Sequence, residues 1–284
     1  MERNCQRGDR RLVSGVLTSQ PIRLLIAAGV VAVYLALGWL LRLDANAYLL
    51  LGIPLLLVFQ LVVARRPLTE LWLKNPPTRF FTWLGLLIAV PFLVYPVCSL
   101  IMDWKSSGWA ERLWSVAAVA GTFPLGATLA RATRRTWMAL LGCVLTAGVL
   151  GGGMMVGFSM LQHHGFHPPH RAWQVGAGSF LLYLPVCFVM EEVFFRGGID
   201  SYVQREGDRF GWLTAIYVSC LWGWWHLPIL GAKSAAEIIL FAVMMPMIHC
   251  VPGIPFSLFW RRGGSLFVTA TVHALIDALR NAVM

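Results

Sequence analysis

Hydrophobic stretches long enough to cross a bilayer recur along the whole chain, separated by short polar segments. A spanning helix needs about 20 predominantly apolar residues. The pattern predicts spanning helices at 22–41, 47–64, 80–102, 113–130, 136–161, 180–204, 212–230, 236–259 and 264–283. We therefore expect an all-α, polytopic transmembrane helical bundle of about eight or nine spans. The stretch 236–259 carries three prolines and a glycine, so we expect it to kink or to re-enter the membrane.

Composition supports a membrane protein and excludes other classes. The 284 residues are 58% hydrophobic and only 13% charged, whereas a soluble domain has about 25% charged residues. The net charge of +10 comes from arginines that flank apolar stretches, as orientation signals do. No basic patch interleaves with aromatic residues, so no nucleic-acid partner is expected. None of the six cysteines forms a CxxC pair, and we interpret them as small buried hydrophobes.

The loop charges predict an orientation in the membrane. Basic residues gather in alternate loops, which the positive-inside rule assigns to the cytoplasm. These segments are the N-terminal tail (1–21) and the loops 65–79, 131–135 and 261–263. The loop 205–211 is assigned to the same side by alternation, although its acids cancel its arginines. The histidine-rich stretch 162–170 is interpreted as a solvated loop, because its prolines break any helix.

Two adjacent acids interrupt the apolar stretch at 180–204. Glu191 and Glu192 precede Arg196 in the run Met190-Glu191-Glu192-Val193-Phe194-Phe195-Arg196. A charge at the bilayer centre costs about 2.5–3.5 kcal/mol on insertion scales, so such residues are usually kept for function. Glu192 and Arg196 share a helix face and can form an ion pair, whereas Glu191 is rotated by about 100°. A purely structural ion pair would explain Glu192 and Arg196 but leaves Glu191 without a partner.

Further polar residues lie in later spans. His226 lies among tryptophans, where a lone histidine is more often a packing residue than a catalyst. His273, Asp277 and Asn281 follow one another at four-residue steps and share one helix face. Either His273 and Asp277 form a structural pair in which each only bonds the other, or the three residues line a polar cavity. We favour the cavity.

A count of residues brings these groups to a common depth. Glu191, His226 and Asp277 lie 14 or 15 residues from flanking loops that the charge rule places on one side. At 1.5 Å per residue these distances are about 21–22 Å, and His273 lies at about 16 Å. We therefore expect one shared site, past the midplane and open toward the extracytoplasmic face.

Over about residues 175–284 the chain resembles the CPBP family of CAAX-protease and bacteriocin-processing membrane proteins, also called the Abi family. That family shows EExxxR, then an aromatic residue and histidine four residues apart followed by Leu-Pro, then HxxxN or HxxxD. The corresponding residues here are Glu191-Glu192-x-x-x-Arg196, Trp222-x-x-x-His226-Leu227-Pro228 and His273-x-x-x-Asp277.

The resemblance implies an intramembrane endopeptidase with a catalytic core over 175–284, preceded by N-terminal transmembrane helices over 22–174. Glu191 would be the general base that activates water, assisted by His226, while His273 and the residue at 277 would stabilise the oxyanion. Glu192 and Arg196 would brace the helix. Asp277 departs from the commoner asparagine, and an ionised carboxylate only accepts hydrogen bonds. Asp277 would then orient His273, or Asn281 would supply the donor.

Two histidines with carboxylates can also form a zinc site with an open position for water. Such a site would use Glu191, His226, His273 and Asp277, although we favour a metal-free, glutamate-type mechanism. The expected partners are the lipid bilayer and a membrane-anchored peptide or protein, and the expected location is a bacterial inner membrane. Two other classes are a non-catalytic scaffold or immunity protein on the same fold and a transporter with a proton relay.

Overall fold

The computed structural model describes residues 19–102, 104–105, 107–163, 170–204 and 211–283. Most of the predicted N-terminal tail, the centre of the histidine-rich loop and the predicted loop 205–211, except Gly211, lie outside the described residues. Within the described part the chain is helical and has no β-strand, only an isolated antiparallel bridge between Leu73 and Ser265. The prediction of an all-α fold is confirmed.

The helices follow one another along the chain with few long connections. The α-helices are α2 (Gln20–Leu41), α3 (Ala45–Val58), α4 (Trp83–Met102), α5 (Trp109–Leu129), α6 (Arg134–Cys143), α7 (Val149–His163), α8 (Ala172–Cys187), α9 (Ser201–Val203), α10 (Trp212–Trp225), α11 (Ala235–Gly263) and α12 (Leu266–Val283). Wider π-helical turns form η2 (Phe59–Val63), η4 (Val144–Gly148) and η5 (Val193–Asp200), and tighter 3₁₀ turns form η3 (Leu68–Leu71) and η6 (Leu227–Ile229).

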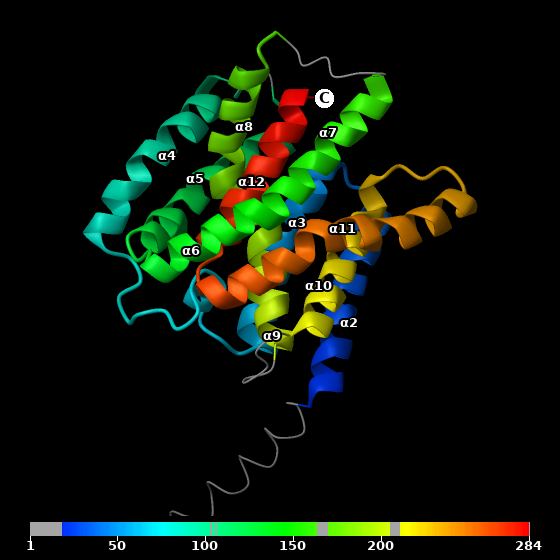
Figure 1. Ribbon diagram of the computed structural model, residues 1–284, viewed down its shortest axis with the longest axis horizontal. Helices are drawn as coiled ribbons and strands as arrows, with labels where there is room; N and C mark the ends of the chain where they lie inside the picture. Colours follow the sequence, from blue (N-terminus) through cyan, green and yellow to red (C-terminus); the bar gives the residue numbers. More distant parts are fainter. Residues whose placement is uncertain (1–18, 103, 106, 164–169, 205–210, 284) are drawn as a thin grey trace, which may run out of the picture.

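Among the described residues, six helical stretches are long and apolar enough to cross a membrane. They are 20–41, 45–63, 83–102, 134–161, 235–263 and 266–283, and α8 is a shorter apolar helix. The chain is therefore an integral, multi-pass membrane protein. In the interior of the bundle, α12 packs against α8 and α7, while α10 packs along α11 (Figure 1).

One predicted span is wrong in its boundaries. The stretch 180–204 was expected as a single helix, but α8 ends at Cys187 and the chain turns at 188–190. The end of α8 is tightened by hydrogen bonds between residues three apart instead of four. Phe188 N–H donates to Pro185 O, and Val189 N–H donates to Val186 O. A new helical stretch begins at Glu191 and passes into η5. The paired acids therefore stand at the start of a helical segment rather than in the middle of one.

The proline-rich stretch forms a single helix, since α11 continues through Pro246, Pro252 and Pro255. Proline cannot donate the backbone hydrogen bond to the carbonyl four residues earlier. At Pro246 the freed carbonyl belongs to Ala242, and it accepts a hydrogen bond of 2.8 Å from Trp224 Nε1 on α10. A side chain from the neighbouring helix thus satisfies the group that the proline leaves unpaired.

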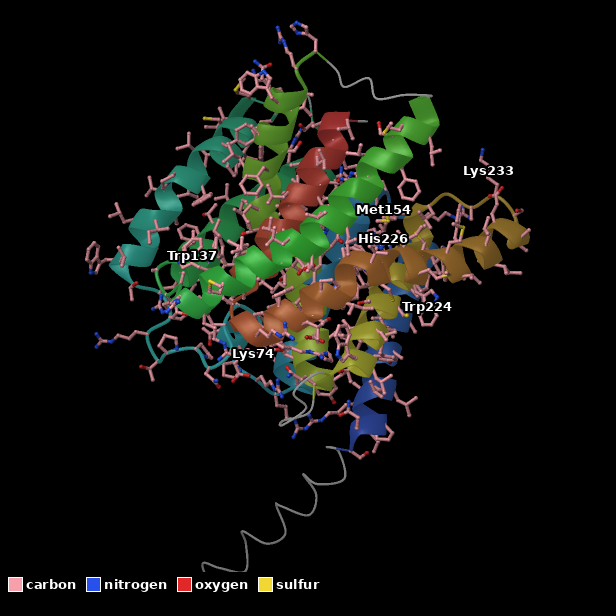
Figure 2. All side chains as sticks on the ribbon, in the orientation of Figure 1. Lys74, Trp137, Met154, Trp224, His226 and Lys233 are labelled. Atoms are coloured by element: carbon pink, nitrogen blue, oxygen red, sulfur yellow. The ribbon has the colours of Figure 1, made fainter. Side chains whose placement is uncertain are left out.

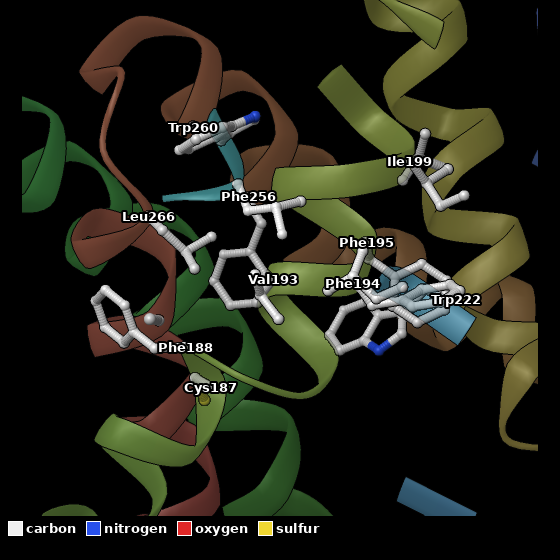
Figure 3. Packing of buried hydrophobic residues seen from close by; sticks show 14 of the residues in the cluster. Cys187, Phe188, Val193, Phe194, Phe195, Ile199, Trp222, Phe256, Trp260 and Leu266 are labelled. Atoms are coloured by element: carbon white, nitrogen blue, oxygen red, sulfur yellow. The ribbon is translucent and has the colours of Figure 1, made fainter. Parts of the chain in front are cut away.

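The core is built around the segment that follows the paired acids, since every residue of η5 is buried. Phe194 and Phe195 pack edge-to-face at 5.2 Å between ring centroids, and Phe195 faces Trp222 of α10 at 6.4 Å (Figure 3). Tyr48 of α3 stacks on Trp225 and donates a hydrogen bond of 2.8 Å to its carbonyl oxygen. These aromatic contacts fix η5 and α10 against the N-terminal helices.

Small residues allow α10 and α11 to approach closely. A Cβ atom added at Gly223 of α10 would lie 2.6 Å from the backbone of Met245 and Pro246 on α11. Close backbone approach at glycine is the usual basis of helix packing in membranes. The separation of these two helices is therefore set by the backbone itself.

We expect Gly223→Ala to destabilise the protein by about 1–3 kcal/mol, because the added methyl group can be accommodated only if the two backbones move apart. Thermal unfolding in detergent, followed by circular dichroism, measures this effect. Gly153→Ala is the matched control, since nothing lies within 4 Å of an added Cβ there. Equal midpoints for the two variants would contradict the packing argument.

Candidate active site

The polar residues of the later helices gather around one buried tryptophan. Trp222 Nε1 donates a hydrogen bond of 3.1 Å to Glu191 Oε2. The Trp222 ring centroid lies 5.3 Å from that of His273, 4.8 Å from that of His249 and 6.1 Å from that of His226. Residues from α10, α11, α12 and the start of the helical segment at Glu191 therefore meet in one place.

His273 of α12 is surrounded by carboxylates. Its Nδ1 lies 3.2 Å from Glu192 Oε1, while its Nε2 lies 3.5 Å from Asp277 Oδ2 and 3.9 Å from Glu191 Oε2. The imidazole is buried, so these carboxylates are its main polar neighbours. Because ionised carboxylates only accept hydrogen bonds, both ring nitrogens are placed to donate.

Glu192 and Arg196 form the ion pair that their spacing predicts. Glu192 Oε2 and Arg196 Nε are 3.9 Å apart, and both side chains are almost completely buried. Arg196 Nη1 also donates a hydrogen bond of 3.0 Å to Ser257 Oγ on α11. The guanidinium carbon lies 5.2 Å from the Trp222 ring and 5.7 Å from the Phe256 ring, within the range of cation–π attraction. Arg196 therefore links η5 to α10 and α11.

His226 and His249 form a second pair of imidazoles, 4.2 Å apart between ring centroids. His226 Nδ1 lies 2.9 Å from Trp222 O, and His249 Nδ1 lies 2.8 Å from Met245 O. A carbonyl oxygen only accepts, so each Nδ1 carries the hydrogen and each Nε2 is the acceptor in the neutral ring. The carbonyl bonds therefore fix both rings with Nε2 available for proton transfer.

Sequence reasoning missed His249. The signal was present, because His249 is an ionisable residue inside an apolar span, which is the criterion that selected Glu191. The contact with His226 depends on how α10 crosses α11, which no spacing along the chain reveals.

Asp277 and Asn281 share a helix face but have different surroundings. Asp277 Oδ1 lies 3.1 Å from Arg280 Nη1, while its other oxygen faces His273. Asn281 Nδ2 donates a hydrogen bond of 3.2 Å to Ser179 Oγ on α8, and its Oδ1 accepts one from Arg280 Nε. The structure thus brings Asp277 into the cluster and directs Asn281 toward α8.

The arrangement does not fit a metal centre. Among the described residues, no three His, Cys, Asp or Glu side chains are grouped so that they could hold a metal ion. The imidazoles of His226 and His249 lie beside each other with 36° between their planes, and His273 directs its two nitrogens at different carboxylates. The residues considered for zinc, Glu191, His226, His273 and Asp277, do not make a ligand set as they stand.

Fold and site together define the class of the protein, a polytopic helical membrane protein with a buried glutamate and histidine cluster between its C-terminal helices. Residues 173–279 match the family model described as Type II CAAX prenyl endopeptidase Rce1-like. This region is similar to the CPBP/CAAX protease family, in agreement with the motifs, and the match points to an intramembrane protease of the CAAX type. No curated protein and no solved structure gave a significant match.

The matched segment runs from the start of α8 into α12 and contains all the clustered residues, including His249. Asn281 lies just beyond it. The predicted division of the chain at 174/175 stays a prediction, although the match begins close to that boundary.

We expect Arg196→Met to destabilise the protein by about 3–5 kcal/mol, because it breaks a buried ion pair of Glu192 and leaves that carboxylate with His273 as its one remaining close partner. Arg280→Met is the matched control: the Arg280 side chain is 39% exposed, and ion pairs of that kind contribute about 0–1 kcal/mol. Thermal unfolding of both variants in the same detergent measures the difference. Equal loss in the two variants would contradict a special role for the buried pair.

Proposed function

We propose that the protein is an intramembrane endopeptidase in which Glu191 activates the attacking water. The observation that carries the proposal is the setting of the Glu191 carboxylate. Trp222 holds its Oε2, and no described residue makes a hydrogen bond to its Oε1. The side chain is 19% exposed, so water can reach it, although Glu192 beside it is buried. A fixed carboxylate with one open oxygen meets the geometric requirement for a general base.

The hydrolytic step can be written with the residues of the cluster. Glu191 accepts a proton from water as the water oxygen adds to the carbonyl carbon of the scissile peptide bond. The same proton then passes from Glu191 to the leaving amine nitrogen as the C–N bond breaks. His226, whose Nε2 is an acceptor in the neutral ring, assists by accepting a hydrogen bond from the water. His249 keeps the His226 ring in position by packing against it.

His273 supports the proposal as the group that stabilises the oxyanion. A developing negative charge is stabilised most by donors that are already held in place. Glu192 fixes Nδ1 of His273 and leaves Nε2 on the side of Glu191. An imidazolium at 273 would also balance the charge of the site, where three carboxylates face two arginines.

In this scheme Asp277 orients His273 rather than donating to the oxyanion. Its carboxylate lies between His273 Nε2 at 3.5 Å and Arg280 Nη1 at 3.1 Å, and both of these partners are donors. An ionised Asp277 has no hydrogen to give. Asn281, the other donor considered, already bonds to Ser179.

The proposed substrate is a membrane-anchored peptide or protein, and access from the extracytoplasmic side of a bacterial inner membrane stays part of the proposal. The loop charges support this orientation. The helical path from Glu191 to Val203 also supports it, because it is unbroken and separates Glu191 from Gln204, where the described segment ends.

We expect Glu191→Gln to lower kcat on a cleavable anchored peptide by about 10²–10⁴-fold, because the amide cannot accept the proton of water. The thermal midpoint should change little, since glutamine fills the same space and still accepts from Trp222. Glu70→Gln is the control, a carboxylate of similar size that is 36% exposed. Undiminished cleavage by the Glu191 variant would favour the non-catalytic scaffold.

We also propose that no metal takes part. Incubation of the purified protein with a strong zinc chelator is expected to leave the cleavage rate unchanged, because the clustered residues do not form a ligand set. The rate is measured before chelation, after chelation and after Zn²⁺ is added back. A loss that added Zn²⁺ restores would overturn the metal-free mechanism.

A further inference from the structure

A polar cavity lies at the end of the bundle where α11 meets α12. It has a volume of about 420 Å³ and lies between residues 73–77, the start of α6 and the α11–α12 turn. Figure 2 shows Lys74, which lines it, near the lower edge of the bundle, well away from His226. The cavity is therefore separate from the cluster around Trp222, and the proposed proteolysis makes no use of it.

The lining of this cavity is strongly basic. Lys74, Arg131, Arg135 and Arg261 all contribute to it, and no acid does. Arg261 is neutralised by Asp200, with Nη2 to Oδ1 at 2.5 Å. In the part of the chain that the structure describes, Lys74, Arg131 and Arg135 form no ion pair. Three positive charges thus line one cavity, and their partners among the described residues are neutral oxygen atoms and the rings of Trp260 and Phe80.

A buried hydroxyl group in the same lining lacks a partner. Ser265 is 2% exposed, and its Oγ makes no hydrogen bond to any described residue. Buried polar atoms are nearly always paired, so the Ser265 hydroxyl group is free to bond a water molecule or an anion in the cavity. Hydroxyl groups and basic side chains together are typical of sites that bind phosphate.

The backbone adds further positive character. Leu266, directly after Ser265, is the first residue of α12, and α6 begins at Arg134 beside the lining residue Thr133. N–H groups there are already in use, since Leu266 N–H donates to Trp72 O and Thr136 N–H donates to Thr133 Oγ1. The partial positive charge at a helix N-terminal end still favours anions. The bond from Lys74 N–H to Gly264 O, 2.9 Å long, holds the loop against the α11–α12 turn. The cavity is therefore preformed.

We propose that this cavity binds a phosphate group, that of an anionic phospholipid headgroup at the membrane surface. The position of the cavity supports a lipid source, because exposed tryptophans lie at its level. Trp137, two residues after Arg135 in the first turn of α6, is 50% exposed, and Trp83, the first residue of α4, is 76% exposed. Exposed tryptophans mark the level of the headgroups, where basic residues attract anionic lipids. A free phosphate ion has the same chemistry, and the experiment separates the two sources.

The state of Lys74 gives the proposal a pH dependence. Burial lowers the pKa of Lys74 to about 8, and Arg261, Arg66 and Arg135 act in the same direction, while Asp200 opposes them. A bound anion would favour the charged form of Lys74. Because the free site loses that charge as the pH rises through about 8, the affinity for the anion should fall between pH 7 and pH 9.

The test uses the full-length protein in detergent, titrated with phosphatidylglycerol, phosphatidylcholine or inorganic phosphate, with lipid binding measured by native mass spectrometry and phosphate binding by calorimetry. We expect saturable binding of phosphatidylglycerol that Arg135→Gln weakens about tenfold, since a charge-assisted hydrogen bond is lost. Ser265→Ala removes no charge and should weaken binding about threefold. Arg134→Gln is the matched control, because Arg134 is exposed like its neighbour Arg135 but does not line the cavity.

Each outcome bears on the proposal. A lipid site is supported if the protein prefers phosphatidylglycerol, and if the cavity variants reduce this preference while Arg134→Gln leaves it unchanged. Binding of inorganic phosphate with the same variant pattern, and no preference among lipids, supports a phosphate site with a free source. Equal weakening by Arg134→Gln and Arg135→Gln, or unchanged binding in both Arg135→Gln and Ser265→Ala, would overturn it. A thermal midpoint measured without lipid shows that each variant is folded.

Discussion

The buried carboxylates set the main constraint on this structure. Glu191, Glu192 and Asp277 lie in apolar helices, where an ionised group is costly unless it is paired. Their partners come from different elements: Arg196 from η5, His273 and Arg280 from α12, and the indole N–H of Trp222 from α10. Because each pairing crosses from one helix to another or spans one turn, the helices that carry the site are held in a single arrangement.

This arrangement also separates the roles of the two adjacent glutamates. Glu192 is enclosed by His273 and Arg196 and has almost no contact with solvent. Glu191 bonds to Trp222 through one oxygen only and stays partly accessible. The break at 188–190 contributes to this difference, since it places the pair at the start of a helical segment. The wide turns of η5 then follow directly, and π-helical turns of this kind are frequent at functional sites.

Much of this could be predicted from the sequence, because the signals are local. Apolar length predicted the helices, and the cost of a charge in lipid selected Glu191, Glu192, Arg196, His273 and Asp277. The Glu192–Arg196 pair followed from helical spacing alone. Other features depend on how distant helices cross, which local spacing does not contain. Three features are of this kind: the contact between the rings of His249 and His226, the hydrogen bond from Asn281 to Ser179, and the end of α8 at Cys187.

The continuity of α11 shows how one helix can depend on its neighbour. Pro246 removes a backbone donor inside the membrane, and Trp224 of α10 supplies an N–H to the Ala242 carbonyl in its place. The two residues therefore form a complementary unit shared by two helices. Among relatives, an exchange of the proline would make the indole dispensable, whereas loss of the indole alone would leave a carbonyl facing hydrocarbon. We therefore expect positions 224 and 246 to vary together, because the packing of α10 against α11 depends on both residues.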